Sequence, residues 1–422
     1  MGKSKKLIRL YLDCTVTSTS LYETGIQRVV RNFFKQLKLL QASGVWEVYP
    51  IALTQARRVD LDDELNPQHT HLDVALKSYL KKRLPRLHKF LRRSFLKSLL
   101  LPFFKYINRV PLSISDPVTL EPELRNVLFL IDSNWNHSVW EYVDKFRKDG
   151  GTVIAMLYDL IPLQYPDTVE DKTKALYLSW WGEALSHVDG IICISKSVRD
   201  QLASGKYLNI KGSGLSEKNI CSVTLGADLI PDDTFIQLLQ RRRPFFLMVG
   251  SIEPRKNHPK VLAAFNEIWN EGYEVDLVII SNNSWKSDAF LLELESNRHL
   301  NRFLFKFDNL NNRELAAMYA ASGALIQASI AEGFGLPIVE ALMFGKKVLC
   351  SDIPIFREVA GERAIYFDPR SISEIKEKIL HILNLDPAYS ECRAIENITV
   401  SWGDSAKQLS SLIREFANLN HK

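Results

Sequence analysis

Residues 324–343, ALIQASIAEGFGLPIVEALM, have the pattern of a strand followed by a loop and a helix. Residues 324–328 are apolar except for Gln327 and few enough to form a buried strand, and a glycine-bearing loop follows them. Pro337 stands at the first turn of an expected helix over 337–343, where the missing N–H of proline costs nothing. The stretch therefore predicts one strand–loop–helix unit of a parallel sheet.

Two glutamates, Glu332 and Glu340, flank this loop and the start of the expected helix. Gly333 and Gly335 let the backbone approach a ligand closely, and the free N–H groups at a helix N-terminus suit an anion. The two carboxylates can accept hydrogen bonds from hydroxyl groups. An anion combined with a polyol indicates a sugar nucleotide as the ligand. The plainer alternative is a strand–helix joint that carries two solvated glutamates.

Strands and helices alternate over most of the chain, which predicts an α/β fold with parallel sheets covered on both faces. In the first half we expect strands at 7–13, 45–53, 126–131, 152–158, 190–194 and 220–223, and helices at 24–41, 137–148, 171–187 and 196–203. In the second half we expect strands at 245–249, 275–281, 324–328 and 347–351, and helices at 259–270, 313–321, 337–343 and 373–383.

This pattern divides the chain into two doubly wound, Rossmann-like domains. The first is expected over 1–230 with an insertion at about 54–122, and the second over 244–400. A C-terminal helix over 401–422 is expected to pack back toward the first domain. Ligands of such sheets bind beyond the carboxyl ends of the strands, so loops of both domains are expected to face an interdomain cleft.

The composition is that of a soluble globular protein. The 422 residues are 46% hydrophobic and 24% charged, and the five cysteines have no paired spacing, which indicates reduced thiols. The apolar run after the basic N-terminus is too short for a signal peptide, and no run approaches the roughly 18 apolar residues of a membrane span. The sequence therefore predicts a cytoplasmic protein, and a net charge of +5 is too small to indicate nucleic acid as a partner.

One stretch of the expected insertion is strongly basic. Residues 81–109 contain ten Lys or Arg and no acidic residue, and apolar residues recur among them at helical spacing. This composition is typical of an interfacial helix on anionic lipid, so we expect peripheral contact with the inner face of the cytoplasmic membrane. A solvated helix packed on the core and a nucleic-acid surface are the alternatives.

The segment Glu332-Gly333-Phe334-Gly335-Leu336-Pro337-Ile338-Val339-Glu340 resembles the nucleotide-sugar signature of the retaining glycosyltransferases of family 4, which have the two-domain GT-B fold. The resemblance implies that Glu332 lies by the donor sugar, with a catalytic role, and that Glu340 holds the ribose hydroxyls. It also places Phe334, Gly335 and Leu336 against the substrate. The similarity is strong over 245–368 and diffuse over the first half.

A second loop, Gly250-Ser251-Ile252-Glu253-Pro254-Arg255-Lys256-Asn257, follows the expected strand 245–249. Negative charge develops on a nucleoside diphosphate as the sugar–phosphate bond breaks, and Arg255 or Lys256 can stabilise it without a metal. A surface turn with incidental charges is the alternative. The loop resembles the diphosphate-binding motif of the family, in which a lysine at the place of Lys256 contacts the phosphates. Ser251 departs from the arginine that many members have there.

Further candidate residues lie in the first half. Gly25 and Arg28 open the first helix, which suits a flexible lid that touches phosphate or acceptor; the alternative is an ordinary helix start with a surface arginine. Asp159 follows an expected strand and is the predicted residue for the acceptor hydroxyl or the donor sugar, or else a helix cap. Related enzymes often have histidine where this chain has Tyr158. Ser195 matches a family serine of uncertain role.

Two more motifs are candidates for binding the nucleobase or a metal ion. Phe307-Asp308-Asn309 matches the loop that family members place against the nucleobase, so Asn309 is a predicted substrate residue. Asp60-Leu61-Asp62 has the spacing of a metal-binding pair, but no expected strand adjoins it, and the nine histidines lack ligand spacing. We therefore expect no metal and no cofactor beyond the nucleotide-sugar donor.

The sequence and the resemblance together imply a retaining, metal-independent hexosyltransferase that forms an α-linkage. GDP-mannose is the first expectation for the donor, because GSIEPRKN, residues 250–257, resembles bacterial mannosyl and deoxyhexosyl transferases of cell-surface polysaccharide assembly. The expected acceptor is a lipid-linked glycan. The rival interpretation is a non-catalytic sugar-nucleotide or glycan-binding subunit of a polysaccharide-assembly complex, which the departures at Tyr158 and Ser251 keep open.

Overall fold

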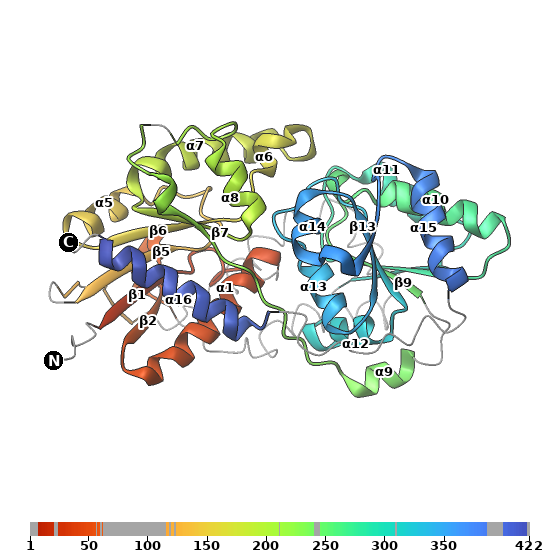
Figure 1. Ribbon diagram of the computed structural model, residues 1–422, viewed down its shortest axis with the longest axis horizontal. Helices are drawn as coiled ribbons and strands as arrows, with labels where there is room; N and C mark the ends of the chain where they lie inside the picture. The colour runs from red at the N-terminus through yellow and green to blue at the C-terminus, as the bar shows by residue number, and fades with distance from the viewer. Residues whose placement is uncertain are drawn as a thin grey trace, which may run out of the picture. The chain divides into compact units, whose positions relative to one another are not determined.

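The computed structural model describes residues 7–20, 24–55, 57–59, 61, 115–117, 120–121, 124–210, 212–239, 245–308, 310–385 and 400–419 (Figure 1). The chain divides into two compact units, Met1–Val153 and Ile154–Lys422. The predicted basic stretch 81–109 and the predicted substrate residue Asn309 lie outside the described residues.

The first unit contains a sheet region built around strand β1, Ile8–Asp13. Parallel strands β2, Trp46–Ala52, and β5, Arg125–Leu130, pair with its two edges. All six residues of β1 are buried, including Arg9, which donates to Glu47, and Asp13, which accepts from Thr15. Helix α1, Gly25–Leu39, turns Val29, Val30, Phe33, Phe34 and Leu37 inward at helical spacing. Helix α5 spans Trp140–Lys148.

The predicted insertion contributes to the same sheet. Strand β3, Arg57–Arg58, pairs antiparallel with β2, and strand β4, Ser115–Pro117, pairs antiparallel with β3. These short segments were not predicted, because two or three residues give no periodic signal.

The second unit begins within strand β6, Thr152–Leu157, which pairs in parallel with β7, Gly190–Cys193; β7 pairs with β8, Ile220–Ser222. Helices α6, Ile161–Gln164, α7, Asp171–His187, and α8, Lys196–Ala203, connect these strands. A further helix, α9, Asp233–Leu239, lies where the sequence indicated only a linker.

A second sheet of six described strands follows in the order β11-β10-β9-β12-β13-β14, and every pair in it is parallel. Its strands are β9 Phe245–Val249, β10 Asp276–Ile280, β11 Leu304–Phe307, β12 Ala324–Gln327, β13 Lys347–Ser351 and β14 Ala364–Phe367. Its helices are α10 His258–Asn270, α11 Asp288–Ser296, α12 Asn312–Ala321, α13 Leu336–Met343, α14 Pro354–Ala360 and α15 Ile372–Leu385. These helices flank the sheet on both sides (Figure 1).

The order of the second sheet reverses at β9. Strand β9 lies between β10 and β12, so the chain winds outward in one direction from β9 and in the other from β12. At such a switch point the loops that follow the two central strands diverge and leave room for a ligand. The loops after β9 and β12 are the two that the sequence singled out. Beneath them lies an apolar core in which Phe246 and Phe265 meet edge to face at 5.6 Å.

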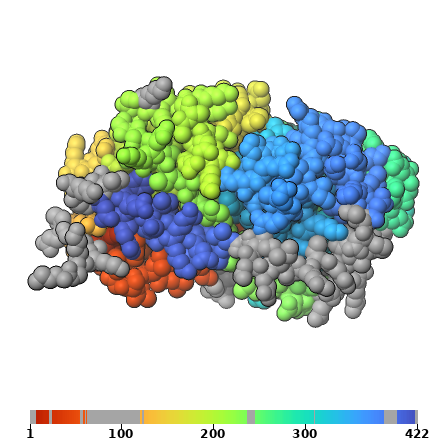
Figure 2. Space-filling model, in the orientation of Figure 1, coloured from red at the N-terminus to blue at the C-terminus, as the bar shows by residue number. Residues whose placement is uncertain are grey.

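The C-terminal helix α16, Trp402–Leu419, packs on β7 and on the chain that leaves β8. A Cβ atom on Gly190 would lie 2.2 Å from the ring of Phe416, so only glycine allows this approach. Asp228 accepts a hydrogen bond from the Trp402 N–H at 2.9 Å. Figure 2 shows α16 in dark blue against the yellow-green segment that contains these residues.

Two carboxylates are buried together in the first unit, at the carboxyl ends of β1 and β5. Asp13 accepts from the N–H and hydroxyl of Thr15 and from the Asn134 amide. Asp132 accepts from the N–H groups of Val16 and Thr17 at 2.9 and 2.6 Å. Together they hold the loop that follows β1. Burial and the neighbouring Asp132 raise the pKa of Asp13, and burial raises that of Asp132.

We expect Asp13→Asn to remove a pH dependence of stability from this unit. A carboxyl whose folded pKa is raised contributes stability that is fully present below its ordinary pKa and is lost as the pH rises through the folded value. The variant should therefore gain stability relative to wild type between pH 5 and pH 8, by at least about 1.4 kcal/mol, the free energy of one pKa unit. Urea unfolding of wild type and variant at pH 5 and at pH 8 measures this gain. A difference in unfolding free energy between the two proteins that is the same at both pH values would contradict the prediction.

Candidate functional site

The loop after β9 adopts a backbone that its residue types require. Gly250 has φ 143° and Asn257 has φ 62°, in regions that glycine and asparagine tolerate. Between them Pro254–Lys256 form one 3₁₀ turn, and Asn257 is the N-cap residue directly before α10. A Cβ on Gly250 would lie 3.4 Å from Cε of Lys256, so the lysine side chain runs across the glycine. The turn thus aims Lys256 inward, where it is 8% exposed.

The loop after β12 is equally constrained. Gly335 has φ 107° and lies directly before α13, whose first turn contains Pro337 as the sequence predicted. A Cβ on Gly333 would lie 2.2 Å from the carbonyl oxygen of Tyr158 and 3.1 Å from Cβ of Asp159. Phe334 is buried and Leu336 half-buried. Glycine at 333 therefore permits a close approach to the segment after β6, whereas the sequence suggested approach to a ligand.

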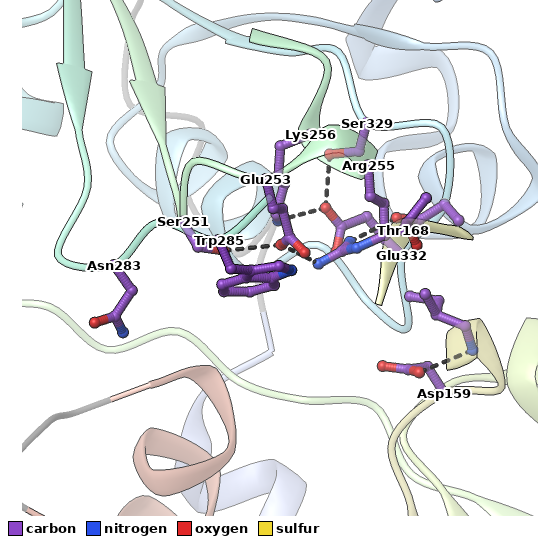
Figure 3. Close-up of polar contacts among 12 residues, drawn as sticks. Asp159, Thr168, Ser251, Glu253, Arg255, Lys256, Asn283, Trp285, Ser329 and Glu332 are labelled. Atoms are coloured by element: carbon purple, nitrogen blue, oxygen red, sulfur yellow. Dashed lines mark hydrogen bonds and ion pairs between the residues drawn. The ribbon is translucent and has the colours of Figure 1, made fainter. Parts of the chain in front are cut away.

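The two loops meet in a network of buried charges. Glu332 Oε2 pairs with Arg255 Nη1 at 2.7 Å, and Glu332 Oε1 binds Lys256 Nζ at 2.5 Å. The Ser329 hydroxyl donates to the same Oε1 at 2.7 Å. Figure 3 shows Glu332 among these three partners. A residue predicted near the donor sugar thus lies directly beside both predicted phosphate-binding cations.

Arg255 is held from three directions. Besides Glu332, it donates to the Ala331 carbonyl at 2.6 Å and to Glu253 Oε1 at 2.7 Å. Glu253 is 3% exposed and also accepts from the Ser251 hydroxyl at 2.8 Å. Because Arg255 belongs to the loop after β9 and binds Glu332 and the Ala331 carbonyl in the loop after β12, it holds the two loops together. Ser251, a departure from the family arginine, takes part in this arrangement through Glu253.

These contacts set the protonation states of the network. Burial would raise the pKa of Glu332, but Arg255 and Lys256 outweigh it and lower that pKa to about 2. Burial lowers the pKa of Arg255, but the carboxylates of Glu332 and Glu253 raise it further than burial lowers it. Glu332 is therefore a carboxylate and Arg255 a cation throughout the neutral range, and Glu332 can only accept hydrogen bonds.

Asp159 lies at the edge of this network (Figure 3). Its Oδ1 accepts from the N–H of Ile161 at 2.9 Å, and its carbonyl accepts from the Tyr177 hydroxyl. Burial raises the pKa of Asp159, while the charge of Arg255 opposes the rise. The side chain thus makes the turn-capping bond that the sequence left as the alternative, beside the residues of the predicted site.

Ser195 and Glu358 join α8 to the second sheet's loops and helices. The Ser195 hydroxyl accepts from the Val198 N–H at 3.1 Å and donates to the Gly333 carbonyl at 2.9 Å. Glu358 on α14 accepts from the N–H groups of Lys196 and Ser197 at 2.8 and 2.7 Å. A carboxylate at the N-terminus of a helix satisfies its free N–H groups and its dipole. Ser195 therefore fixes the glycine that follows Glu332.

Glu340 lies away from the network, on the first turns of α13. It is 1% exposed, and its Oε2 accepts from the Tyr319 hydroxyl at 2.7 Å. Its predicted contact with ribose stays a prediction.

The remaining predicted residues are distributed as follows. Gly25 is the exposed first residue of α1 and Arg28 is half-buried in its first turn, both in the first unit. Asp308 pairs with Lys306 beside the undescribed Asn309. Asp60 and Asp62 lie outside the described residues, and within the described part of the chain no group of three metal-ligating side chains could hold an ion. No described helix has the length and apolarity needed to cross a membrane.

Sequence reasoning missed Glu253, Ser329 and Trp285. Glu253 and Ser329 each precede a predicted site residue by two or three positions at the carboxyl end of a strand, which was the available signal. The Trp285 ring lies next to Glu253 (Figure 3), and the backbone N–H of Trp285 donates to the Ile252 carbonyl at 3.1 Å. No local spacing links Trp285 to the motif.

Part of the chain resembles proteins of known family. Residues 230–398 match the family model described as "Glycosyl transferases group 1". The serotype-specific mannosyltransferase WbdA of Escherichia coli is 34% identical over 280 residues, 63% of this chain and 34% of the relative. The O-antigen chain mannosyltransferase RfbU of Salmonella typhimurium is 27% identical over 56% of this chain and 62% of the relative. The chain spans about a third of the length of the first of these relatives.

Solved structures resemble the whole chain in fold. Sucrose-phosphate synthase from Thermosynechococcus elongatus has a TM-score of 0.62 at 16% identity, covering 97% of this chain and 99% of that one. The catalytic domain of starch synthase IV from Arabidopsis thaliana has a TM-score of 0.61 at 12% identity, covering 98% and 100%. With the two mostly parallel sheets, these likenesses confirm the predicted α/β, GT-B fold class.

Proposed function

We propose that this chain, which carries a glycosyl transferases group 1 domain over residues 230–398, moves a hexose from a nucleotide-sugar donor to a glycan acceptor. The observation that carries the proposal is the buried network of Lys256, Arg255 and Glu332 at the switch point between β9 and β12. Cations are needed where a diphosphate leaves, and a fixed carboxylate is needed where a sugar presents hydroxyls. In this network the cations and the carboxylate are directly bonded to each other.

The donor in this proposal is GDP-mannose and the product an α-linkage formed with retention. The mannosyltransferase names of the relatives support the choice of sugar. Lys256 stabilises the charge that develops on the departing diphosphate, so the proposed reaction needs no metal and no cofactor. Arg255, held by Glu253 and the Ala331 carbonyl, keeps Glu332 in place for the sugar. Asp159 is proposed to act on the acceptor side, beside Gly333.

The proposed acceptor is a lipid-linked glycan at the cytosolic membrane face, and the proposed pathway is polysaccharide assembly, in which a complex of partners would fit. The relative RfbU is an O-antigen chain mannosyltransferase, which supports such an acceptor. The basic, acid-free stretch 81–109 supports peripheral contact with anionic lipid.

A thermal-shift panel of GDP, UDP, dTDP and CDP, followed by transfer from the labelled donor, tests the function. A nucleotide at 100 times its dissociation constant should stabilise the folded protein by about 2.7 kcal/mol. We expect GDP to give the largest shift, and GDP-mannose to be consumed when acceptor is present. Nucleotide binding without transfer or hydrolysis would favour the binding-subunit interpretation, and no shift with any of the four would reject a nucleotide-sugar site.

We expect Glu340→Ala to raise the Michaelis constant for donor more than it lowers the maximal rate. A ribose contact exists equally in the ground state and the transition state, so its loss weakens binding without slowing the chemical step. Tyr319→Phe, which removes the hydrogen bond to Glu340, should raise the Michaelis constant to a smaller extent. Steady-state kinetics at varied donor measures both. A sharp fall in maximal rate at an unchanged Michaelis constant would contradict the ribose role.

The triple substitution Arg92→Glu, Arg93→Glu and Lys97→Glu should weaken membrane binding. Each cation near an anionic surface contributes about 1 kcal/mol, and salt screens the attraction. We expect lower sedimentation with anionic vesicles and lower activity on a lipid-linked acceptor, with activity on a short soluble acceptor retained. Equal loss on both acceptors would indicate a structural role for this stretch, and undiminished vesicle binding would reject the membrane contact.

A further inference from the structure

We infer that Glu332 makes the site discriminate between the intact sugar nucleotide and the nucleoside diphosphate left after transfer, by competing with the diphosphate for Lys256. This inference rests on the proposed function and adds a role in product release. Its evidence is the distribution of charge and contacts around one lysine.

Lys256 is the exchangeable cation of the network. Its ammonium binds Glu332 Oε1, the one carboxylate within ion-pair distance of it among the described residues. Arg255, in contrast, is bound to Glu332, Glu253 and the Ala331 carbonyl at the same time. An arriving anion can therefore draw Lys256 away from a single partner, whereas drawing Arg255 away would break three contacts.

The four ion-paired side chains of the network already sum to zero charge, with the carboxyl group of Asp159 at their edge. Two cations, Arg255 and Lys256, face two carboxylates, Glu253 and Glu332, and the four side chains are between 2% and 13% exposed. Charges in so buried a site are screened far less than on a surface. A diphosphate that draws Lys256 from Glu332 therefore meets the repulsion of a neighbouring carboxylate that Arg255 still offsets but Lys256 no longer does.

The intact donor can offset this repulsion, and the product cannot. When Lys256 turns to the phosphate, Glu332 Oε1 loses a donor, and a sugar hydroxyl attached to the same ligand can replace it. After transfer the diphosphate carries no such hydroxyl. Glu332 keeps its position through Ser329 and Arg255, so it remains within reach of Lys256 and displaces the diphosphate.

Calorimetric titration of GDP and GDP-mannose into purified variants tests the inference. Glu332→Gln should bind GDP at least about tenfold more tightly than wild type, a change of about 1.4 kcal/mol. The affinity for GDP-mannose should increase less than the affinity for GDP, so the ratio of the two affinities should shift toward GDP. GDP should also become a stronger product inhibitor of any residual transfer. Glu293→Gln, which removes an exposed charge from α11, is the matched control and should bind both ligands as wild type does.

The double variant Glu332→Gln with Lys256→Gln separates the competition from a general charge effect. If the two residues compete as inferred, the gain in GDP affinity should vanish in the Lys256→Gln background. A gain that persists there, an equal gain for GDP-mannose, or no gain in Glu332→Gln would each overturn the inference. Should Glu332→Gln fold poorly, Glu332→Asp keeps the charge but shortens its reach, and it should still tighten GDP binding a few-fold; unchanged binding would count against the inference.

The outcomes distinguish this inference from the function on which it rests. If wild type binds none of the four nucleoside diphosphates of the thermal-shift panel, the proposed function fails and this inference fails with it. If wild type binds GDP and transfers mannose but Glu332→Gln shows no gain for GDP, only the role of Glu332 in product release is wrong.

Discussion

Replacing Lys256 by alanine should lower the maximal transfer rate by about 10²- to 10³-fold, the usual cost of removing one preorganised donor from a developing negative charge. Lys256 is 8% exposed and lies at the switch point of the second sheet, where water cannot substitute for its charge. Its interaction with the diphosphate strengthens as the sugar bond breaks. The loss should therefore appear mainly in the rate, with a smaller change in the Michaelis constant.

Single-turnover transfer at saturating donor measures this effect. Lys260→Ala is the matched control, because Lys260 lies in the first turn of α10, shortly after Lys256, and binds the Arg370 carbonyl instead of the network. The control should retain wild-type turnover. Unchanged turnover in Lys256→Ala would remove this lysine from the mechanism and leave Arg255 as the cation to test.

Gly333→Ala should damage both stability and activity, although it adds only one methyl group. The new Cβ would lie 2.2 Å from the Tyr158 carbonyl oxygen, a backbone atom that cannot rotate away. Overpacking of this kind costs about 1 to 3 kcal/mol of stability. It also shifts the residue next to Glu332, and a displacement of about 1 Å at a reacting site can cost about 10²-fold in rate. We expect both losses together.

Urea unfolding and transfer kinetics on the same preparation measure the two losses. Gly182→Ala provides the control, since Gly182 lies within α7 with no atom inside 4 Å of its would-be Cβ. Alanine there should be neutral or stabilising by up to about 1 kcal/mol. Wild-type stability and activity in Gly333→Ala would show that the approach of this loop to Tyr158 is not required.

Several elements of the second sheet escaped prediction for a common reason. Strands β11 and β14 are its two edges, and three of the four residues in each are only half-buried. An edge strand lacks the unbroken apolar run by which the central strands were recognised. Helix α14 is seven residues long, and α11 buries only Phe290 and Leu294 among its nine described residues, so neither gives a strong helical period.

In the site, the sequence identified individual residues, whereas the contacts between distant residues came only from the structure. The sequence identified Lys256 and Glu332 as chemistry-bearing residues, but it treated them as separate contacts to phosphate and sugar. The structure joins them across 76 positions in one ion pair and adds Ser329 and Glu253 to the network. It also shows Arg255 engaged by protein groups and Glu340 buried against Tyr319. Such pairings depend on distances between segments that spacing along the chain does not contain.

The sequence by itself determined the alternation of strands and helices, because a buried parallel strand is mostly apolar and a helix start favours proline and glycine at fixed positions. It also determined which loops carry charge. Only the tertiary structure decided that β9 and β12 are neighbours, so that the loops after them share one site. Strand order is set by the packing of whole βα units in the core, and the buried charges then pair because none of them can remain unpaired away from water.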